Sequence, residues 1–334
     1  MIILRTVKNI SSLNIAASVL LFLAAILAAV VANSSLSPVY QDFLLQELHL
    51  RIGNFNLFSH GGHPLKMIEF INDCLMTVFF LAVGLEIKRE LLVGELSSVR
   101  KAALPFIAAC GGMVVPVVIY ALSVASGTPE TRGMAIPMAT DIAFSLGVLS
   151  LLGKRVPLSL KIFLTAFAVV DDIGGILVIA LFYSADVAYG YLIAAAVLYV
   201  FLYYMGKFGV TQKIFFLFFG VIIWYLFLQS GIHSTISGVI LAFVIPARPR
   251  LDAGKYIERI RDIIGEFPVS KSDNIVLTNA QIATLKQVER ASDYVISPLQ
   301  SLEDNLHGAV SFVILPLFAF ANAGVVFSGS GSIV

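Results

Sequence analysis

Two adjacent carboxylates interrupt an apolar stretch near the middle of the chain. Asp171 and Asp172 lie within residues 157–184, which are otherwise mostly apolar. The length and composition of this stretch predict a membrane-spanning helix. Carboxylates at mid-membrane depth are costly and are usually kept for ion or proton pathways. No Lys or Arg adjoins the pair, so we predict a site where a hard cation and a proton compete for carboxylate oxygens.

Helical geometry gives the two aspartates different surroundings. Successive residues of a helix project about 100° apart. We therefore expect one of Asp171 and Asp172 to face the ion path and the other to meet a neighbouring helix. The alternative is a purely structural polar pair that neighbouring helices satisfy.

Polar residues also break the apolar segment 133–152, which contains Pro137, Thr140 and Asp141. Broken helices in transporters present backbone carbonyls and helix ends at mid-membrane depth. Thr140 would add a hydroxyl and Asp141 a carboxylate to the same site. A proline kink without a role in binding is the alternative.

Charged residues gather at one end of the segment 67–87. Glu86 and Glu90 are four residues apart, so they share a helix face, and Lys88 and Arg89 lie between them. This pattern is typical of a solvated helix end, but it also fits a charged funnel or a network that responds to pH.

Three further residues on the same side could join that network, namely Glu303, Asp304 and His307. Histidine is the side chain whose ordinary titration falls near physiological pH. His233 opens the segment 231–246 on the opposite side, where a capping or interface role is the alternative. Asp73, near the start of the segment 67–87, becomes relevant if it is buried.

Composition places these residues in a membrane protein. The chain has 334 residues, of which 58% are hydrophobic and only 13% charged, about half the share usual in soluble proteins. Its net charge of +1 gives no reason to expect a nucleic acid partner. We predict an all-α polytopic protein with one membrane domain. The candidate spans are 13–33, 67–87, 102–125, 133–152, 157–184, 187–205, 211–229, 231–246 and 308–328.

The distribution of Lys and Arg predicts the orientation, because cytoplasmic loops carry the excess of both. We place the N-terminus in the cytoplasm, with a retained first helix. The short segments on that side then hold Arg5, Lys8, Lys88, Arg89, Arg100, Lys101, Lys154, Arg155, Lys161, Lys207 and Lys213, against Arg51, Lys66 and Arg132 outside.

Two connections have patterns of their own. Apolar and polar residues alternate around Gly53-Asn54, so residues 48–58 predict a small β-hairpin in the first outer loop, which could pair with a second copy. An ordinary loop is the alternative. Residues 247–307 form a polar segment in which isoleucines and leucines recur at helical spacing. We expect amphipathic helices on the cytoplasmic surface there.

Several runs in the right order resemble the NhaA family of bacterial sodium/proton antiporters. They are residues 79–91, 139–147, 160–164 with 170–174, and 314–324. The resemblance implies an inverted-repeat fold with broken helices. It also implies a bacterial inner-membrane antiporter that exports Na⁺ or Li⁺ in exchange for protons, and a homodimer formed through the hairpin at 48–58.

The resemblance also implies residue roles. Asp172 would be the main cation ligand, Asp171 its essential neighbour, and Thr140 and Asp141 the contribution of the broken helix. The pH-sensing residues would be Glu86, Arg89, Glu90, Glu303, His307 and His233. Asp304 stands where the best-known pattern has histidine.

The chain departs from the family in length. Family members resemble twelve-helix proteins, whereas this chain reaches Val334 after the counterpart of helix nine. The second broken helix, and a lysine partnering the position of Asp171, would lie beyond that point. We therefore expect an inverted-repeat fold with its second repeat incomplete, in a fragment, a split gene product or a partial sequence.

Two other functions compete with the antiporter, for which we expect no cofactor. An inactive or partner-dependent fragment is the first. An intramembrane aspartyl protease is the second and more remote, because such enzymes place one aspartate in a Gly-x-Gly-Asp setting. Here Asp171 follows Val170 and Asp141 follows Thr140.

Overall fold

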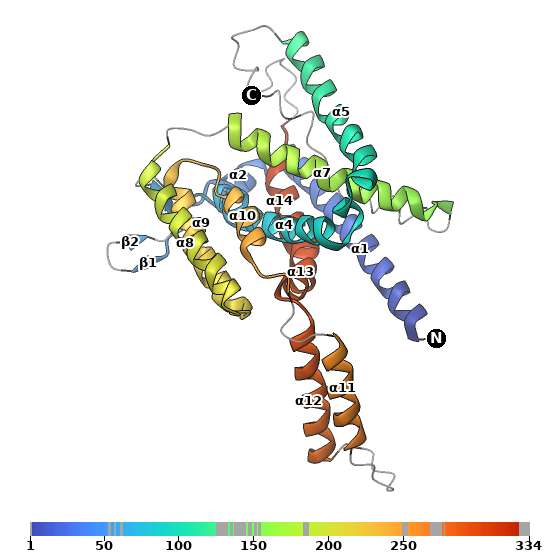
Figure 1. The fold of residues 1–334 in the computed structure, drawn as a ribbon. Coiled ribbons are helices and arrows are strands. Elements are labelled where there is room, and N and C mark those ends of the chain that lie inside the picture. Colours follow the sequence, from blue (N-terminus) through green and yellow to red (C-terminus); the bar gives the residue numbers. More distant parts are fainter. Residues whose placement is uncertain are drawn as a thin grey trace.

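The structure is a computed structural model, and most of the chain that it describes is helical (Figure 1). It describes residues 2–52, 55–56, 58–60, 63–124, 133, 136, 145, 149, 152, 155–182, 187–248, 253–267, 276 and 278–326. The α-helices are α1 (Ile2–Ala32), α2 (Ser37–Leu45), α3 (Met67–Phe70), α4 (Met76–Val93), α5 (Val99–Ser123), α7 (Leu158–Phe182), α8 (Tyr189–Lys207), α9 (Lys213–Ser230), α10 (Thr235–Val244), α11 (Ala253–Gly265), α12 (Asn279–Val295), α13 (Pro298–Ala309) and α14 (Leu315–Asn322).

Within the described residues, five continuous helical segments are long and apolar enough to cross a membrane. They are Met67–Val93, Ala102–Ser123, Tyr189–Lys207, Lys213–Ser230 and Pro298–Asn322. Ala16–Ala32 and Ser37–Leu45 together form a sixth candidate, bent by 113°. The prediction of a polytopic helical membrane protein is therefore confirmed. The fifth predicted span is the continuous helix α7, whereas most of the segment 133–152 lies outside the described residues.

Two of the spanning segments contain a π-helical turn, in which each backbone hydrogen bond reaches one residue further along the chain than in an α-helix. The turn η1 (Ile71–Leu75) joins α3 to α4, and η5 (Val310–Ile314) joins α13 to α14. The apolar side chains of the two turns pack in shared clusters between the segments. A short 3₁₀ turn, η2 (Glu95–Ser97), follows α4.

The last span begins earlier than the apolar pattern predicts. Pro298 occupies the first turn of α13. The Ser297 hydroxyl caps that helix by accepting a hydrogen bond from the backbone N–H of Gln300. The helix then continues through η5 into α14. Glu303, Asp304 and His307 consequently lie on the spanning helix itself, rather than in the connection before it.

Short strands occupy the connection between α2 and α3. The strand β1 (Arg51–Ile52) pairs antiparallel with β2 (Phe55–Asn56), and β3 (Ser59–His60) pairs antiparallel with β4 (His63–Pro64). The Gln229 side-chain amide donates a 2.6 Å hydrogen bond to the Ser59 carbonyl and so attaches this region to α9.

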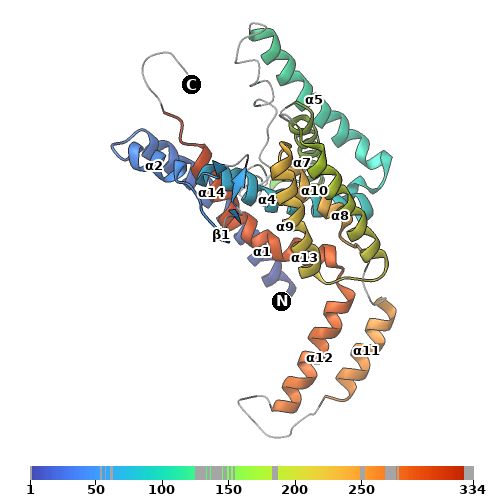
Figure 2. The same ribbon diagram turned by 90° about the vertical axis from the view of Figure 1, so that its left-hand side faces the viewer.

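The connection 247–307 contains a helical pair. The helices α11 and α12 pack against each other and extend away from the remaining helices in both views (Figures 1 and 2). The next helix, α13, returns to the helical body and packs on α4.

The closest helix pair in the body is α4 with the short helix α10. A Cβ atom added to Gly238 would lie 2.4 Å from the Thr77 carbonyl oxygen, and one added to Gly84 would lie 2.8 Å from the Ala242 Cβ. Small residues allow two helix backbones to approach this closely in a membrane. The position of α10 is therefore set by the backbone of α4.

Gly238→Ala tests this packing. The added methyl group meets a backbone carbonyl that cannot rotate away, so we expect a loss of about 1–3 kcal/mol of stability, measured as thermal unfolding in detergent. Gly190→Ala on α8 is the matched control, because its Cβ would have nothing within 4 Å. Equal unfolding temperatures for Gly238→Ala and the unmutated chain would contradict the described approach of α10 to α4.

Candidate functional site

The aspartate pair lies on α7, where that helix packs against α4 and α5. The surrounding apolar cluster draws Val83 and Ile87 from α4, Ala109 from α5 and Val170 from α7. Asp171 itself is 4% exposed. Asp172 is partly buried, and its Oδ2 atom is fully so. The structure therefore places both predicted carboxylates in a dehydrated setting, where a bound proton or cation would offset the cost of burying charge.

Glycines allow α5 to approach α7 beside this pair. A Cβ added to Gly174, one helical turn after Asp171, would lie 2.0 Å from the Met113 sulfur. One residue earlier on α5, a Cβ on Gly112 would meet the Phe167 ring at 3.4 Å. The Met113 thioether from α5 and the Phe167 ring from α7 thus lie between the two helices. The other residues predicted for this site, Thr140 and Asp141, lie outside the described residues.

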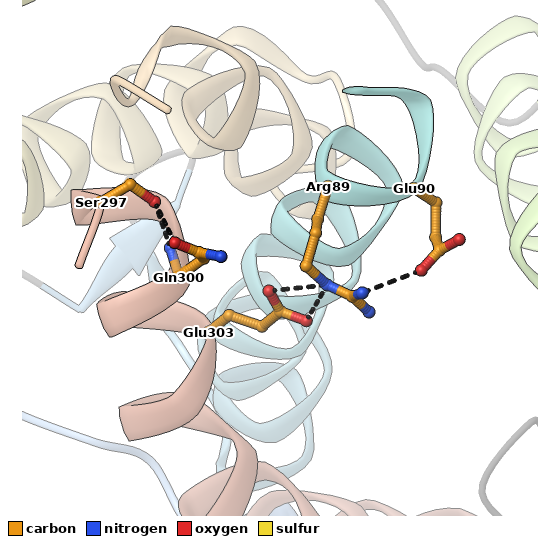
Figure 3. Close-up of polar contacts among 5 residues, drawn as sticks. All are labelled: Arg89, Glu90, Ser297, Gln300 and Glu303. Carbon is orange, nitrogen blue, oxygen red and sulfur yellow. Dashed lines mark hydrogen bonds and ion pairs between the residues drawn. The ribbon is translucent and has the colours of Figure 1, made fainter. Parts of the chain in front are cut away.

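A second polar group joins α4 to α13 (Figure 3). The Arg89 Nε atom donates to both carboxylate oxygens of Glu303, at 2.9 and 3.2 Å, and Nη1 lies 3.0 Å from the Glu90 Oε1 atom. Charge-assisted bonds of this length are among the stronger hydrogen bonds in proteins. The Glu90 and Glu303 side chains are only 12% and 21% exposed, so solvent screens these contacts weakly.

The structure brings together four of the six residues predicted to respond to pH. Glu86 is partly buried and interacts electrostatically with Arg89, Glu90 and Glu303. We call these four residues the charge cluster. Sequence spacing predicts the neighbours on α4, and the fold adds Glu303 from a helix more than two hundred residues away.

Two predicted members lie apart from the charge cluster. His307 is exposed on α13, and among the described residues no ion pair joins it to the four. His233 lies in the turn before α10, next to Ser234, which contacts Asp73. Asp73 and Glu86, the first charge-cluster residue on this segment, are thirteen residues apart, so His233 and the charge cluster are separated by roughly 20 Å of helix.

Asp73 holds a more connected position than its sequence context indicates. Its backbone carbonyl accepts hydrogen bonds from the Trp224 indole and the Ser234 hydroxyl, both at 3.2 Å, and from the Thr77 hydroxyl. The Ser234 hydroxyl also lies 3.3 Å from the carboxylate oxygen Oδ1. These contacts attach η1 to α9 and to the start of α10.

An amide pair that sequence reasoning missed joins the two segments containing π-helical turns. Asn322 donates to the Asn72 oxygen at 2.8 Å, and Asn72 donates to the Asn322 oxygen at 3.2 Å. Asn322 is a single polar residue in an apolar run, whereas Asn72 is followed directly by Asp73. A polar residue that recurs in two separate spans is the signal that could have suggested the pair, because polar side chains often join membrane helices.

Lys88 makes the remaining polar link from α4. Its ammonium donates to the backbone carbonyls of Phe243, at 2.7 Å, of Ala242, at 3.4 Å, and of Ile245. These groups form the carboxyl end of α10, which carries partial negative charge and has no donors within the helix. Adjacent basic residues of α4 therefore bind different helices.

Glu303→Gln tests the ion pair to α13. It removes a charged partner from a partly exposed arginine, so we expect stability to fall by about 1 kcal/mol, measured as thermal unfolding in detergent. Asp304→Asn changes the exposed neighbour and should leave stability within about 0.5 kcal/mol of the unmutated chain. If both variants unfold at the same temperature, the pair does not stabilise α13 on α4.

Comparison with known proteins identifies the family to which this chain belongs. A family model described as Na⁺/H⁺ antiporter 1 matches residues 8–333. A Na⁺/H⁺ antiporter NhaA from Bacteroides thetaiotaomicron is 76% identical over all 334 residues of this chain, which cover 76% of that relative. A protein of the same name from Porphyromonas gingivalis is 47% identical over 331 residues, covering 98% of this chain and 73% of the relative. The chain therefore belongs to the Na⁺/H⁺ antiporter 1 family.

Proposed function

We propose that the chain is a secondary antiporter, not an enzyme, that exchanges Na⁺ for protons at the aspartate pair of α7. The observation that carries this proposal is the burial of Asp171 and the partial burial of Asp172 beside an apolar cluster formed by α4, α5 and α7. Buried carboxylates without hydration are stable when a proton or a cation occupies them. Membership of an antiporter family supports the same reaction.

In this mechanism, Asp172 is the principal cation ligand and Asp171 its neighbour. Na⁺ is a hard cation that takes oxygen ligands, so carboxylates and hydroxyls suit it. Thr140 and Asp141 complete the site in the proposal. At high proton concentration the carboxylates are protonated and release the cation, and at low proton concentration the cation replaces the proton. Alternating exposure of the occupied site to the two sides converts this competition into exchange. Li⁺ uses the same oxygen ligands in the proposal.

We propose the charge cluster as the part that adjusts exchange to pH. Its carboxylates share one guanidinium between α4 and α13, so a change in their protonation alters the force between those helices. His307 and His233 act separately from the charge cluster in this proposal. His307 is exposed on α13, and His233 lies beside Ser234 at the amino end of α10.

The remaining features of the proposal concern topology and assembly. They are nine transmembrane helices in an NhaA-like inverted repeat, a cytoplasmic N-terminus, the bacterial inner membrane with its lipids, and a homodimer formed through a hairpin at 48–58. The connection 247–307 lies on the cytoplasmic side. The excess of Lys and Arg on one side of the membrane supports this orientation.

Asp172→Asn tests the ion site. The amide keeps the shape of the side chain but holds no exchangeable charge, so we expect Na⁺-induced proton release from everted membrane vesicles to fall to background. Asp304→Asn removes a carboxylate from an exposed position and should retain exchange at an equal expression level. Near-normal exchange by Asp172→Asn would show that Asp172 does not bind the transported ion.

Glu90→Gln tests the pH response. The Arg89 guanidinium loses one of its two acidic partners while the aspartate pair is untouched, so we expect a displaced pH profile with part of the maximal rate retained. The measurement is the rate of Na⁺-dependent proton release across a pH series. Complete loss of exchange at every pH, with normal expression, would instead indicate that Glu90 binds the transported ion.

A further inference from the structure

Lys88 differs from the other charged residues at its end of α4. Glu86, Arg89 and Glu90 interact with one another and with Glu303, whereas the Lys88 ammonium points to α10. An ammonium group has three donors, and three backbone carbonyls of α10 or the residue after it accept from Lys88. The sequence of α10 contains no titratable side chain. Lys88 therefore recognises the end of a helix and not a counter-ion.

The lysine completes a series of contacts along the whole of α10. The first end of this ten-residue helix is fixed to Asp73 through Ser234, and its middle is fixed by the close packing at Gly238 and Gly84. Lys88 binds the last carbonyls. Ten residues make a helix of marginal stability, so its attachments decide its position.

One residue further along α4, Arg89 reaches in a different direction to Glu303 on α13. The carbonyls at the end of α10 would lose their donor if Lys88 lost its ammonium. Arg89 carries five donors and is adjacent in sequence, so it is a ready replacement. An Arg89 side chain drawn to α10 would leave Glu303 without its guanidinium.

We propose that Lys88 is a positioning residue for antiport: by occupying the carboxyl end of α10, it keeps Arg89 on Glu303 and so sets the pH dependence of exchange. The proposal rests on the antiport function proposed above. Lys88 itself contacts neither of the aspartates on α7 in this arrangement.

The charged and titratable groups around Lys88 come from three elements. They are Glu86, Arg89 and Glu90 on α4, Glu303, Asp304 and His307 on α13, and Lys213 at the start of α9, which donates to the Ser301 hydroxyl at 2.7 Å. Of these groups, Lys88 acts through the Arg89–Glu303 pair alone.

Lys88→Met is the first test, with Na⁺-dependent proton release from everted vesicles measured across a pH series. We expect the pH of half-maximal exchange to move by about 0.5 unit or more, with the apparent KM for Na⁺ at the optimum changed less than twofold. Lys88→Arg retains charge and donors and should restore the profile. An unmoved profile in Lys88→Met would overturn the proposal, whether or not the maximal rate falls.

A double variant separates this proposal from an independent charge effect. If Lys88 acts through Arg89 and Glu303, then Lys88→Met combined with Glu303→Gln should shift the profile no further than Glu303→Gln alone. Additive shifts would show that Lys88 acts by another route. Lys213→Met is the matched control, because it removes a lysine that binds α13 at a hydroxyl, and it should leave the profile unchanged.

Hydrogen–deuterium exchange of the purified chain tests the same contact without transport. In Lys88→Met we expect faster exchange in peptides covering 241–248 and 299–305, with 189–205 on α8 unchanged. Unchanged exchange in both of the first two regions would overturn the proposal. Absence of Na⁺-dependent proton release by the unmutated chain would instead count against the proposed function, and the exchange measurement would still decide the role of Lys88.

Discussion

The near-contact between the backbones of α4 and α10 is the constraint on which the rest of the described structure depends. At Gly238 the α10 backbone meets the Thr77 carbonyl directly, and at Gly84 the α4 backbone meets the Ala242 Cβ and the Val239 backbone, so α10 cannot rotate or slide without a collision. This fixes Ser234 beside Asp73 at one end of α10 and its free carbonyls beside Lys88 at the other. The remaining faces of α4 are then available to α13 and to the aspartate helix α7.

Desolvation explains how charge is distributed around α4. A charged group inside an apolar body is stable only with a partner, and this helix supplies partners on several sides. Arg89 binds carboxylates from its own helix and from α13, while Lys88 binds the carbonyl end of α10. The two aspartates of α7 lie beside an apolar cluster of α4, α5 and α7. In the proposed function, the transported cation or proton offsets the cost of burying these carboxylates.

The sequence predicts those parts of the structure that depend on local composition. Apolar length predicts the spanning helices, and the apolar flanks on both sides of the Asp171–Asp172 pair predict burial of Asp171. The four-residue spacing of Glu86 and Glu90 places them on one face with Arg89 nearby. Only the resemblance to a family predicts that Glu303 belongs with these residues, because no local pattern relates residues so far apart in the sequence.

The contacts between distant helices could not be predicted from local patterns. In the sequence, Lys88 is one of several charged residues at a helix end. None of the residues adjacent to it in the sequence indicates that α10 ends beside it. Asn72 and Asn322 are unremarkable alone, and each π-helical turn leaves the apolar pattern of its segment intact. The early start of the last span was missed because residues 298–309 are polar enough to resemble a connection. Each of these features depends on which helices pack together.

Competition between Na⁺ and protons at the aspartate pair is the central claim, and direct binding tests it without requiring transport. The measurement is equilibrium binding of radioactive Na⁺ to the purified chain across a pH series, beside Asp172→Asn. The account predicts saturable binding that weakens as the solution is acidified and that is lost in the variant. Binding that is independent of pH, or that survives intact in Asp172→Asn, would contradict it.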